Sequence, residues 1–480
     1  MCYGGPAFNS RKAIMKDAPL EHGDSIGHAG DHYTQPANAT AEPPRTFRAT
    51  LKYLGPSVII SATIVGSGEI VLTASLGAAV GYSMLWWVLF SCWSKSILQA
   101  ELTRYIVLSG DTYFRALNRL PGKIPGPKKP FAWPLALEML GLLASLTGLG
   151  GLIGGAGQAV ALLFPGLDPL IAVALLAVLA SVVLGSGSYR RLESVMLVFV
   201  VTFTVLTVAG ALLMQGTEFA TRTSDIVSGF KFEFSTTFAV LALAAYGYTG
   251  VNSGEISAYT YWCIEKGYAA RIGRFDDTPD WYRRAHGWLR VLRTDVWMTL
   301  LILTCATIPF YILGAGVLHA MGERPEGSAM VPALSNMYTS TLGPWSLWLF
   351  GIGAFSILYS STLAAIAARA RYIPDYLIEL GFTTRDRLDL RRAIIRWYCL
   401  IVPFIGLGLY VGFQRPVLMV TIAACYAAIM LPVQSAITIY LQSKRLPVQV
   451  QPKWPARYFL RLTFMMQLVL ACAVIYFVVL

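Results

Sequence analysis

Charged side chains are scarce in this sequence. Asp, Glu, Lys and Arg make up 13% of its 480 residues, whereas 55% are apolar. A soluble chain carries roughly 25% charged residues, so the deficit excludes an ordinary soluble domain and predicts a protein with many membrane spans. The chain carries a net charge of +12, which in a membrane protein is expected to lie in cytoplasmic loops. No nucleic-acid partner is therefore predicted.

The residue pairs that carry metal or nucleophile chemistry are also missing. The seven cysteines form no Cys-x-x-Cys pair, and the five histidines all fall in the N-terminal tail or the loops. We therefore expect no disulfide framework, no thiolate metal site, no bound cofactor and no enzyme activity. The N-terminus has no apolar signal segment, so no cleaved signal peptide is expected. The composition of residues 1–48, rich in Gly, Pro, Asp and His, predicts a disordered cytoplasmic tail.

Eleven apolar stretches long enough to cross a bilayer follow the tail. They lie at about 54–80, 83–108, 134–163, 168–187, 192–214, 237–263, 294–318, 343–368, 395–412, 416–441 and 457–479. With the N-terminus inside, 33 of the 38 lysines and arginines fall in inside segments and 4 in outside loops; Lys95 is the remaining one. This asymmetry obeys the positive-inside rule. The sequence therefore predicts an all-α integral membrane protein of 11 transmembrane helices, with its C-terminus outside, in what we expect to be a bacterial plasma membrane.

The tripeptide Ser-Gly-Glu occurs twice, at 67–69 in the first stretch and at 253–255 in the sixth. A glycine within a span lets the helix unwind, so that backbone carbonyls can face a cavity. Under the predicted topology these two stretches run in opposite directions. They would open two inverted five-helix repeats, 49–214 (TM1–TM5) and 237–441 (TM6–TM10), which is a transporter architecture. An added helix would occupy 457–480; coincidence is the alternative explanation for so short a repeat.

Carboxylates at bilayer depth are costly, so each predicts a functional site with a partner. If the two breaks meet, Glu69 and Glu255 approach each other beside Asn252. Two carboxylates with neutral oxygens suit a hard cation such as Mg²⁺, Ca²⁺ or Mn²⁺, so these three residues are the predicted metal ligands. Like charges at close range would also favour protonation of one glutamate and offer a route to proton coupling. The predicted substrate site consists of Gly66, Ser67, Gly68, Glu69, Lys95, Asn252, Ser253, Gly254 and Glu255.

Lys95 complicates the cation hypothesis. It lies too far inside the second stretch to reach the membrane surface easily. Pairing with one glutamate would reduce the charge available to a dication, and would favour a monovalent cation, a zwitterion or an anion. Two alternatives stay open: Lys95 faces a wet cavity, and one of the glutamates is purely structural.

Two further segments have competing interpretations. The stretch 134–163 contains glycines at 148, 150, 151, 154, 155 and 157. Their small-xxx-small spacing predicts close helix packing, and is preferred over a nucleotide-binding loop because no strand is expected before it. The basic and aromatic segment 265–293 is compatible with an amphipathic helix lying in the membrane interface.

Several short motifs carry a family resemblance. Residues 54–56 read Leu-Gly-Pro, and residues 77–86 read GAAVGYSMLW. Together with YRRLE at 189–193 and Leu-Pro at 431–432, they resemble the Nramp (natural resistance-associated macrophage protein) family of proton-coupled divalent metal transporters, whose first broken helix precedes a G-A-x-x-G-Y-S-x-L-W motif. The resemblance implies a five-plus-five inverted repeat with broken helices 1 and 6, and a small ion as substrate.

The metal-binding signatures of that family are altered here. Its Asp-Pro-Gly-Asn motif corresponds to residues 66–69, so that the Asp is lost and Glu69 stands in the place of the Asn. In its Met-Pro-His motif, Asn252 replaces the Met and Gly254 replaces the His. The acidic residues that the family carries within its third span are missing, and the span holds only Glu138, near its inner end. We therefore expect a secondary transporter of a hard divalent cation working by alternating access; a non-metal solute or ion, with Lys95 in the site, is the alternative. The oligomeric state is left open.

Overall fold

A computed structural model describes residues 39–64, 67–185, 189–325 and 330–478. Most of the predicted tail lies outside these residues. The described chain begins with short helices and the first long ones. Its elements up to residue 228 are α2 (Phe47–Leu51), α3 (Pro56–Ile64), the π-helical η1 (Ser67–Thr73), α4 (Ala74–Val80), η2 (Gly81–Met84), α5 (Leu85–Ser109), α6 (Tyr113–Asn118), β1 (Lys123–Ile124), β2 (Phe131–Ala132), α7 (Trp133–Leu163), α8 (Pro169–Gly185), α9 (Tyr189–Leu213), η3 (Met214–Gly216) and α10 (Thr223–Ser228). The strands β1 and β2 pair antiparallel.

The second half of the chain repeats this pattern of long helices joined by short ones. Its elements are α11 (Ala239–Tyr248), α12 (Ser253–Glu265), α13 (Tyr268–Ile272), α14 (Pro279–Leu313), the π-helical η4 (Gly314–Leu318), α15 (His319–Met321), α16 (Met330–Leu342), α17 (Ser346–Leu380), α18 (Leu388–Phe413), α19 (Pro416–Arg445), η6 (Val448–Val450) and α20 (Trp454–Val478).

Each predicted apolar stretch coincides with one helix or with consecutive helical pieces. Within the described residues, 7 helical stretches are long and apolar enough to cross a membrane, and Pro169–Gly185 is one of the shorter apolar helices. The all-helical membrane fold is thus confirmed, while the count of eleven spans stays a prediction.

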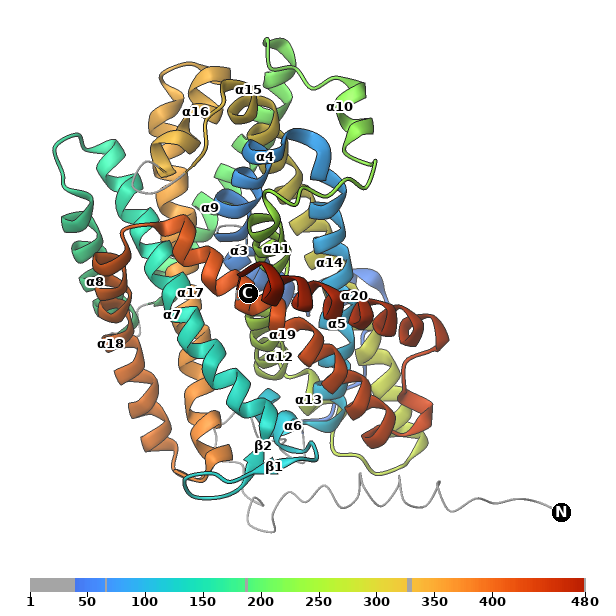
Figure 1. Ribbon diagram of the computed structural model, residues 1–480. Helices are drawn as coiled ribbons and strands as arrows, with labels where there is room; N and C mark the ends of the chain where they lie inside the picture. The colour runs from blue at the N-terminus through green and yellow to red at the C-terminus, as the bar shows by residue number, and fades with distance from the viewer. Residues whose placement is uncertain (1–38, 65–66, 186–188, 326–329, 479–480) are drawn as a thin grey trace.

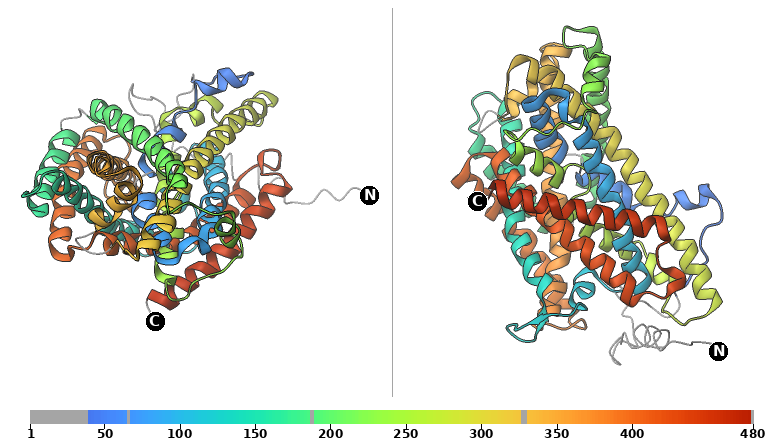
Figure 2. Two further views of the ribbon diagram at one scale, coloured as in Figure 1. Left: turned by 90° about the horizontal axis from the view of Figure 1, so that it is seen from above. Right: turned by 45° about the vertical axis from the view of Figure 1, so that its right-hand side comes forward.

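The loops separate into two groups at opposite ends of the molecule. Figure 1 shows α6, β1, β2 and α13 at one end and α10, α15 and α16 at the other. The first group belongs to segments expected inside and the second to segments expected outside. The alternation of all eleven spans, and which end faces the cytoplasm, stay predictions. The last helix, α20, crosses this bundle obliquely in front of α5 and α19 (Figure 2).

The helical structure changes at both copies of the tripeptide. The π-helical η1 begins at Ser67, directly after residues that lie outside the described ones, whereas the chain is not helical between the end of α11 at Tyr248 and the start of α12 at Ser253. The two regions lie against each other, because a Cβ placed on Gly68 would come within 2.6 Å of the Tyr248 carbonyl oxygen. Glycine at position 68 therefore lets η1 and the α11–α12 break meet backbone to backbone.

The glycines of α7 lie in the middle of a continuous helix, which excludes the nucleotide-loop interpretation. A Cβ on Gly151 would lie 2.8 Å from the Pro416 carbonyl oxygen, and a Cβ on Gly154 would lie 2.2 Å from the Tyr410 ring. The predicted packing role is confirmed, because these glycines bring α19 and α18 close to α7.

The segment 265–293 does not form a separate helix on the membrane surface. Helix α14 runs from Pro279 to Leu313 without a break, so its first turns continue into the apolar stretch. Trp281 and Trp288 are fully buried, and the Trp288 indole donates a hydrogen bond to the Ala41 carbonyl at 2.9 Å. The interface-helix interpretation was wrong because these aromatic side chains pack on the protein itself.

Candidate functional site

The break between α11 and α12 is held by two oppositely charged, fully buried side chains. The Lys95 ammonium donates to the carbonyls of Tyr246 and Thr249 at 2.5 and 2.6 Å. On the other side, the Gly250 backbone N–H donates to a carboxylate oxygen of Glu69 at 3.2 Å. The single peptide unit between Thr249 and Gly250 therefore binds an ammonium through its C=O and a carboxylate through its N–H. We call Lys95, Glu69 and this peptide unit the peptide clamp.

Neighbouring hydroxyl groups complete the peptide clamp. Ser91 donates to the same two carbonyls that Lys95 binds, at 3.0 and 2.9 Å. The Thr307 hydroxyl of α14 donates to Glu69 at 3.1 Å. The carbonyls at the end of α11 carry the partial negative charge of a helix C-terminus, which favours a cation there. Lys95 is 0% exposed, so the alternative in which it faces a wet cavity is wrong.

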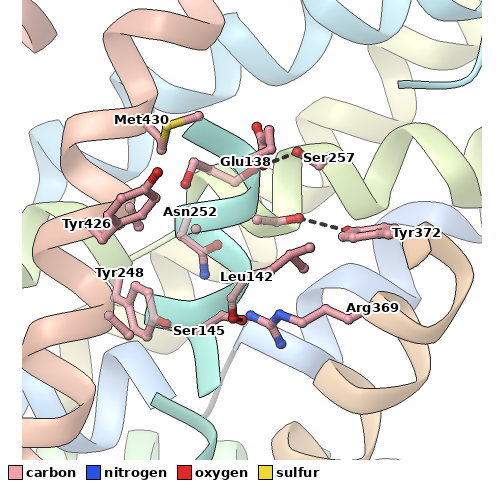
Figure 3. A pocket seen from close by; sticks show the side chains of 15 residues that line it. Glu138, Leu142, Ser145, Tyr248, Asn252, Ser257, Arg369, Tyr372, Tyr426 and Met430 are labelled. Carbon is pink, nitrogen blue, oxygen red and sulfur yellow. Dashed lines mark hydrogen bonds between the residues drawn. The ribbon is translucent and has the colours of Figure 1, made fainter. Parts of the chain in front are cut away.

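A cavity lies beside α12, between α7, α17 and α19 (Figure 3), and encloses ≈ 490 Å³ of empty space, open solvent included. Its polar lining includes Glu138 of α7, Asn252 at the break, and Arg369 and Tyr372 of α17. Figure 3 shows the Arg369 guanidinium pointing into this space. The cavity therefore brings together charged, amide and hydroxyl groups from α7, α17 and the break before α12.

Asn252 and Glu255 together form the start of α12. The Asn252 side-chain oxygen accepts from the Glu255 backbone N–H at 2.9 Å, which caps the helix. The Glu255 carboxylate lies in the first turn, where a helix N-terminus favours negative charge. Glu255 also lines a smaller adjoining recess together with Arg369 and Tyr248. Its surroundings therefore include the Arg369 guanidinium.

Hydrogen bonds tie the α12 start to the far side of the cavity. The Tyr113 hydroxyl donates to Glu138 and accepts from the Gln434 side-chain amide at 2.9 Å. The same amide donates to the Ser253 carbonyl at 3.0 Å, and the Tyr372 hydroxyl donates to the Gly254 carbonyl at 3.0 Å. Ser253 and Gly254 thus contribute backbone carbonyls to this hydrogen-bond network.

The structure divides the predicted site into two parts. Lys95, Gly68 and Glu69 lie at the peptide clamp, whereas Asn252, Ser253, Gly254 and Glu255 lie at the cavity. Neither of the two recesses described above is lined by Glu69. Among the described residues, no three His, Cys, Asp or Glu side chains gather in a way that could hold a metal ion. Gly66 and the side chain of Ser67 lie outside the described residues.

Sequence reasoning missed part of the cavity lining. The apolar stretch predicted to end at residue 368 places Arg369 in an inside loop. Helix α17 instead continues to Leu380 and carries Arg369 into the cavity. Glu138 had been noted only as an acidic residue near the end of the third stretch. In the structure, Glu138 lies between one and two turns after the start of α7, and Arg369 lies about three turns before the end of α17.

Known proteins share the all-helical membrane fold described above. The fold and the broken-helix site define a multi-pass membrane transporter, not an enzyme. The family model described as "Natural resistance-associated macrophage protein-like" matches residues 57–477, and the chain therefore belongs to the Nramp family.

Among curated proteins, the uncharacterized protein PM0681 of Pasteurella multocida (strain Pm70) is 24% identical over 331 residues, which cover 68% of this chain and 70% of that protein. Among solved structures, the manganese transporter of Eremococcus coleocola is similar with a TM-score of 0.64 at 14% identity, covering 92% of this chain and 89% of that one. Mhp1, a nucleobase-cation-symport-1 family transporter, gives a TM-score of 0.54 at 13% identity, with 93% of each chain covered. At these identities the two structures show a shared fold.

Proposed function

We propose that the protein is a secondary transporter of a hard divalent metal cation (Mg²⁺, Mn²⁺ or Ca²⁺), working by alternating access around the two helix breaks. Membership of the Nramp family and the fold shared with a manganese transporter support this proposal. The observation that carries it is the cavity beside the α12 break, whose lining includes the oxygen-bearing side chains of Asn252 and Glu138. Such oxygen donors suit hard cations, and the Met-to-Asn change at position 252 removes a soft ligand.

The peptide clamp modifies the predicted ligand set. Glu69 already accepts hydrogen bonds from Gly250 and Thr307 and lies across one peptide unit from the Lys95 ammonium. We therefore propose Asn252, Glu255 and Glu138 as the residues that meet the cation, with Glu69 holding the break in shape. Proton coupling is part of the proposal and is tested by recording internal pH.

The decisive experiment is divalent-cation flux into proteoliposomes, with Mg²⁺, Mn²⁺ and Ca²⁺ tested separately. We expect Glu255→Gln to lower flux at least tenfold, because it removes a cavity carboxylate. The matched control is Glu233→Gln, which changes an exposed glutamate in the α10–α11 loop and should leave flux unchanged. An absence of divalent flux from folded wild-type protein would reject the metal hypothesis.

One observation favours a second candidate function. Arg369 lines both recesses, and a guanidinium repels a dication but binds a carboxylate in bidentate fashion. A small solute that carries a carboxylate is therefore the second candidate, with Arg369 taking the place first assigned to Lys95. In that case small carboxylates should raise the melting temperature of the wild type, and Arg369→Gln should abolish that response. A wild type stabilised by divalent cations alone would reject this candidate.

A further inference from the structure

The peptide clamp has the composition of a cation site that is already filled. Broken transporter helices commonly coordinate a coupling cation through unwound carbonyls and the C-terminal end of a half-helix. Here the carbonyls of Tyr246 and Thr249 converge in that way, and the Ser91 hydroxyl lies within 3.0 Å of both. The group between them is the Lys95 ammonium, which comes from the neighbouring helix α5.

The positive charge of the Lys95 ammonium is balanced by the negative charge of Glu69, so no external ion is needed. Its positive charge faces two carbonyl oxygens, lies 5.1 Å from the centre of the Tyr246 ring, and is matched by Glu69 across the Thr249–Gly250 peptide unit. A buried ammonium is costly unless such partners compensate it. Removal of the Lys95 side chain would leave the carbonyls, the hydroxyl and the carboxylate in place as a cradle for a small cation.

We propose that the Lys95 ammonium is a tethered cation occupying a monovalent-cation site at the α11–α12 break, so that the transport cycle draws no Na⁺ or K⁺ to this position. The proposal goes beyond the identity of the transported solute, because the clamp is separate from the residues that line the cavity. Lys95 is thereby a positioning residue: it holds the C-terminal end of α11 where the broken helix bends.

The test is thermal unfolding of the purified full-length chain in detergent, which needs no knowledge of the transported solute. Lys95→Ala opens the cradle, whereas Lys95→Met fills the same space with an apolar chain and serves as the matched control. NaCl, KCl or NH₄Cl is titrated against choline chloride at constant ionic strength. We expect a saturable rise in the melting temperature of Lys95→Ala, by roughly 2 °C or more, with at least one small cation. Lys95→Met and the wild type should not respond.

Two results would overturn the proposal. One is a Lys95→Ala variant that responds to small cations no more than Lys95→Met does. The other is a wild type that Na⁺ or K⁺ stabilises saturably relative to choline. If Lys95→Ala fails to fold under standard conditions, it is expressed and extracted in NH₄Cl and, in parallel, in choline chloride. Recovery of monodisperse protein in ammonium alone supports the tethered cation, and equal failure in both salts rejects it. Because no flux is measured, failure here is distinguishable from failure of the metal-transport proposal.

Discussion

Gly250 is the residue on which the shape of the peptide clamp depends. Its φ of +72° lies in the left-handed region, and a Cβ at this position would come within 3.0 Å of the Cys92 Cα. An L side chain there would be strained in conformation and would also collide with α5. The peptide that binds both Lys95 and Glu69 can be presented in this orientation because position 250 has no side chain.

We therefore predict that Gly250→Ala lowers the free energy of unfolding by about 2–4 kcal/mol, from the left-handed conformation together with overpacking. Gly166→Ala is the matched control, since Gly166 has a φ of +104° but nothing within 4 Å of a new Cβ. The control should lose only about 1–2 kcal/mol. Urea-induced unfolding in detergent would measure both variants, and equal losses would refute the role of the close contact with Cys92.

The two Ser-Gly-Glu copies show why single residues of the candidate site could be only partly predicted from the sequence. Glu69 and Glu255 have identical neighbours in sequence, which suggested equivalent roles. Glu69 instead lies within the π-helical η1 and binds the Gly250 N–H, whereas Glu255 opens α12 beside the Arg369 recess. The difference arises from partners that other helices bring from distant parts of the chain, and no local pattern specifies them.

At the scale of elements, Asp295 of α14 joins α3 to α12. Its carboxylate accepts from the Ser57 hydroxyl of α3 at 2.8 Å and from the Tyr259 hydroxyl of α12 at 2.6 Å. The Gly55 backbone N–H, just before α3, donates to it at 3.3 Å. One buried carboxylate thus connects α14 to the start of the first broken helix and to the second half of the other.

Asp295→Asn should therefore destabilise the protein by about 1.5–3 kcal/mol, because an amide replaces one acceptor oxygen by a donor and removes the charge that strengthens these bonds. Asp389→Asn is the control, since Asp389 is fully exposed near the start of α18. A melting-temperature shift should be seen in Asp295→Asn only. Equal melting temperatures for both variants would contradict the joining role of Asp295.

Helix α7 offers a second prediction at this scale. Gly151 lies against the Pro416 carbonyl of α19, whereas Gly408 of α18 has nothing within 4 Å of an added Cβ. Gly151→Val should reduce the yield of folded protein several-fold and lower its melting temperature, because two helices must separate to admit the side chain. Gly408→Val should leave both quantities nearly unchanged. Size-exclusion profiles from matched membranes would compare them, and identical profiles would count against the packing role.

At the scale of the whole molecule, hydropathy was sufficient to predict the positions of the helical elements. Long apolar runs exclude other spanning structures, so the positions of the helices follow directly from composition. The cavity lining did not follow. Helix α17 extends beyond its apolar run and carries Arg369, whereas Glu138 lies within its own run but meets cavity partners that other helices supply. Charges near helix ends look alike in sequence whether they face a loop or a cavity.

The predicted orientation can be checked with single cysteines in a cysteine-free background. Lys231 and Arg290 are both exposed, at opposite predicted sides of the membrane. A membrane-impermeant maleimide should label Lys231→Cys in intact cells, and Arg290→Cys only after permeabilisation. The reverse pattern would invert the topology, and labelling of both in intact cells would reject the predicted alternation.

Helix α14 also has a mechanical consequence. Trp288 near its start binds the Ala41 carbonyl, and Thr307, 19 positions later, binds Glu69. At 1.5 Å per residue these two contacts are about 28 Å apart on one uninterrupted rod. An α-helix is stiff along its axis, so a pull on the segment around Ala41 reaches the interior of the protein as a displacement of Thr307 of nearly the same size. The chain before the first membrane helix is thus coupled through rigid α14 to the buried Glu69 carboxylate.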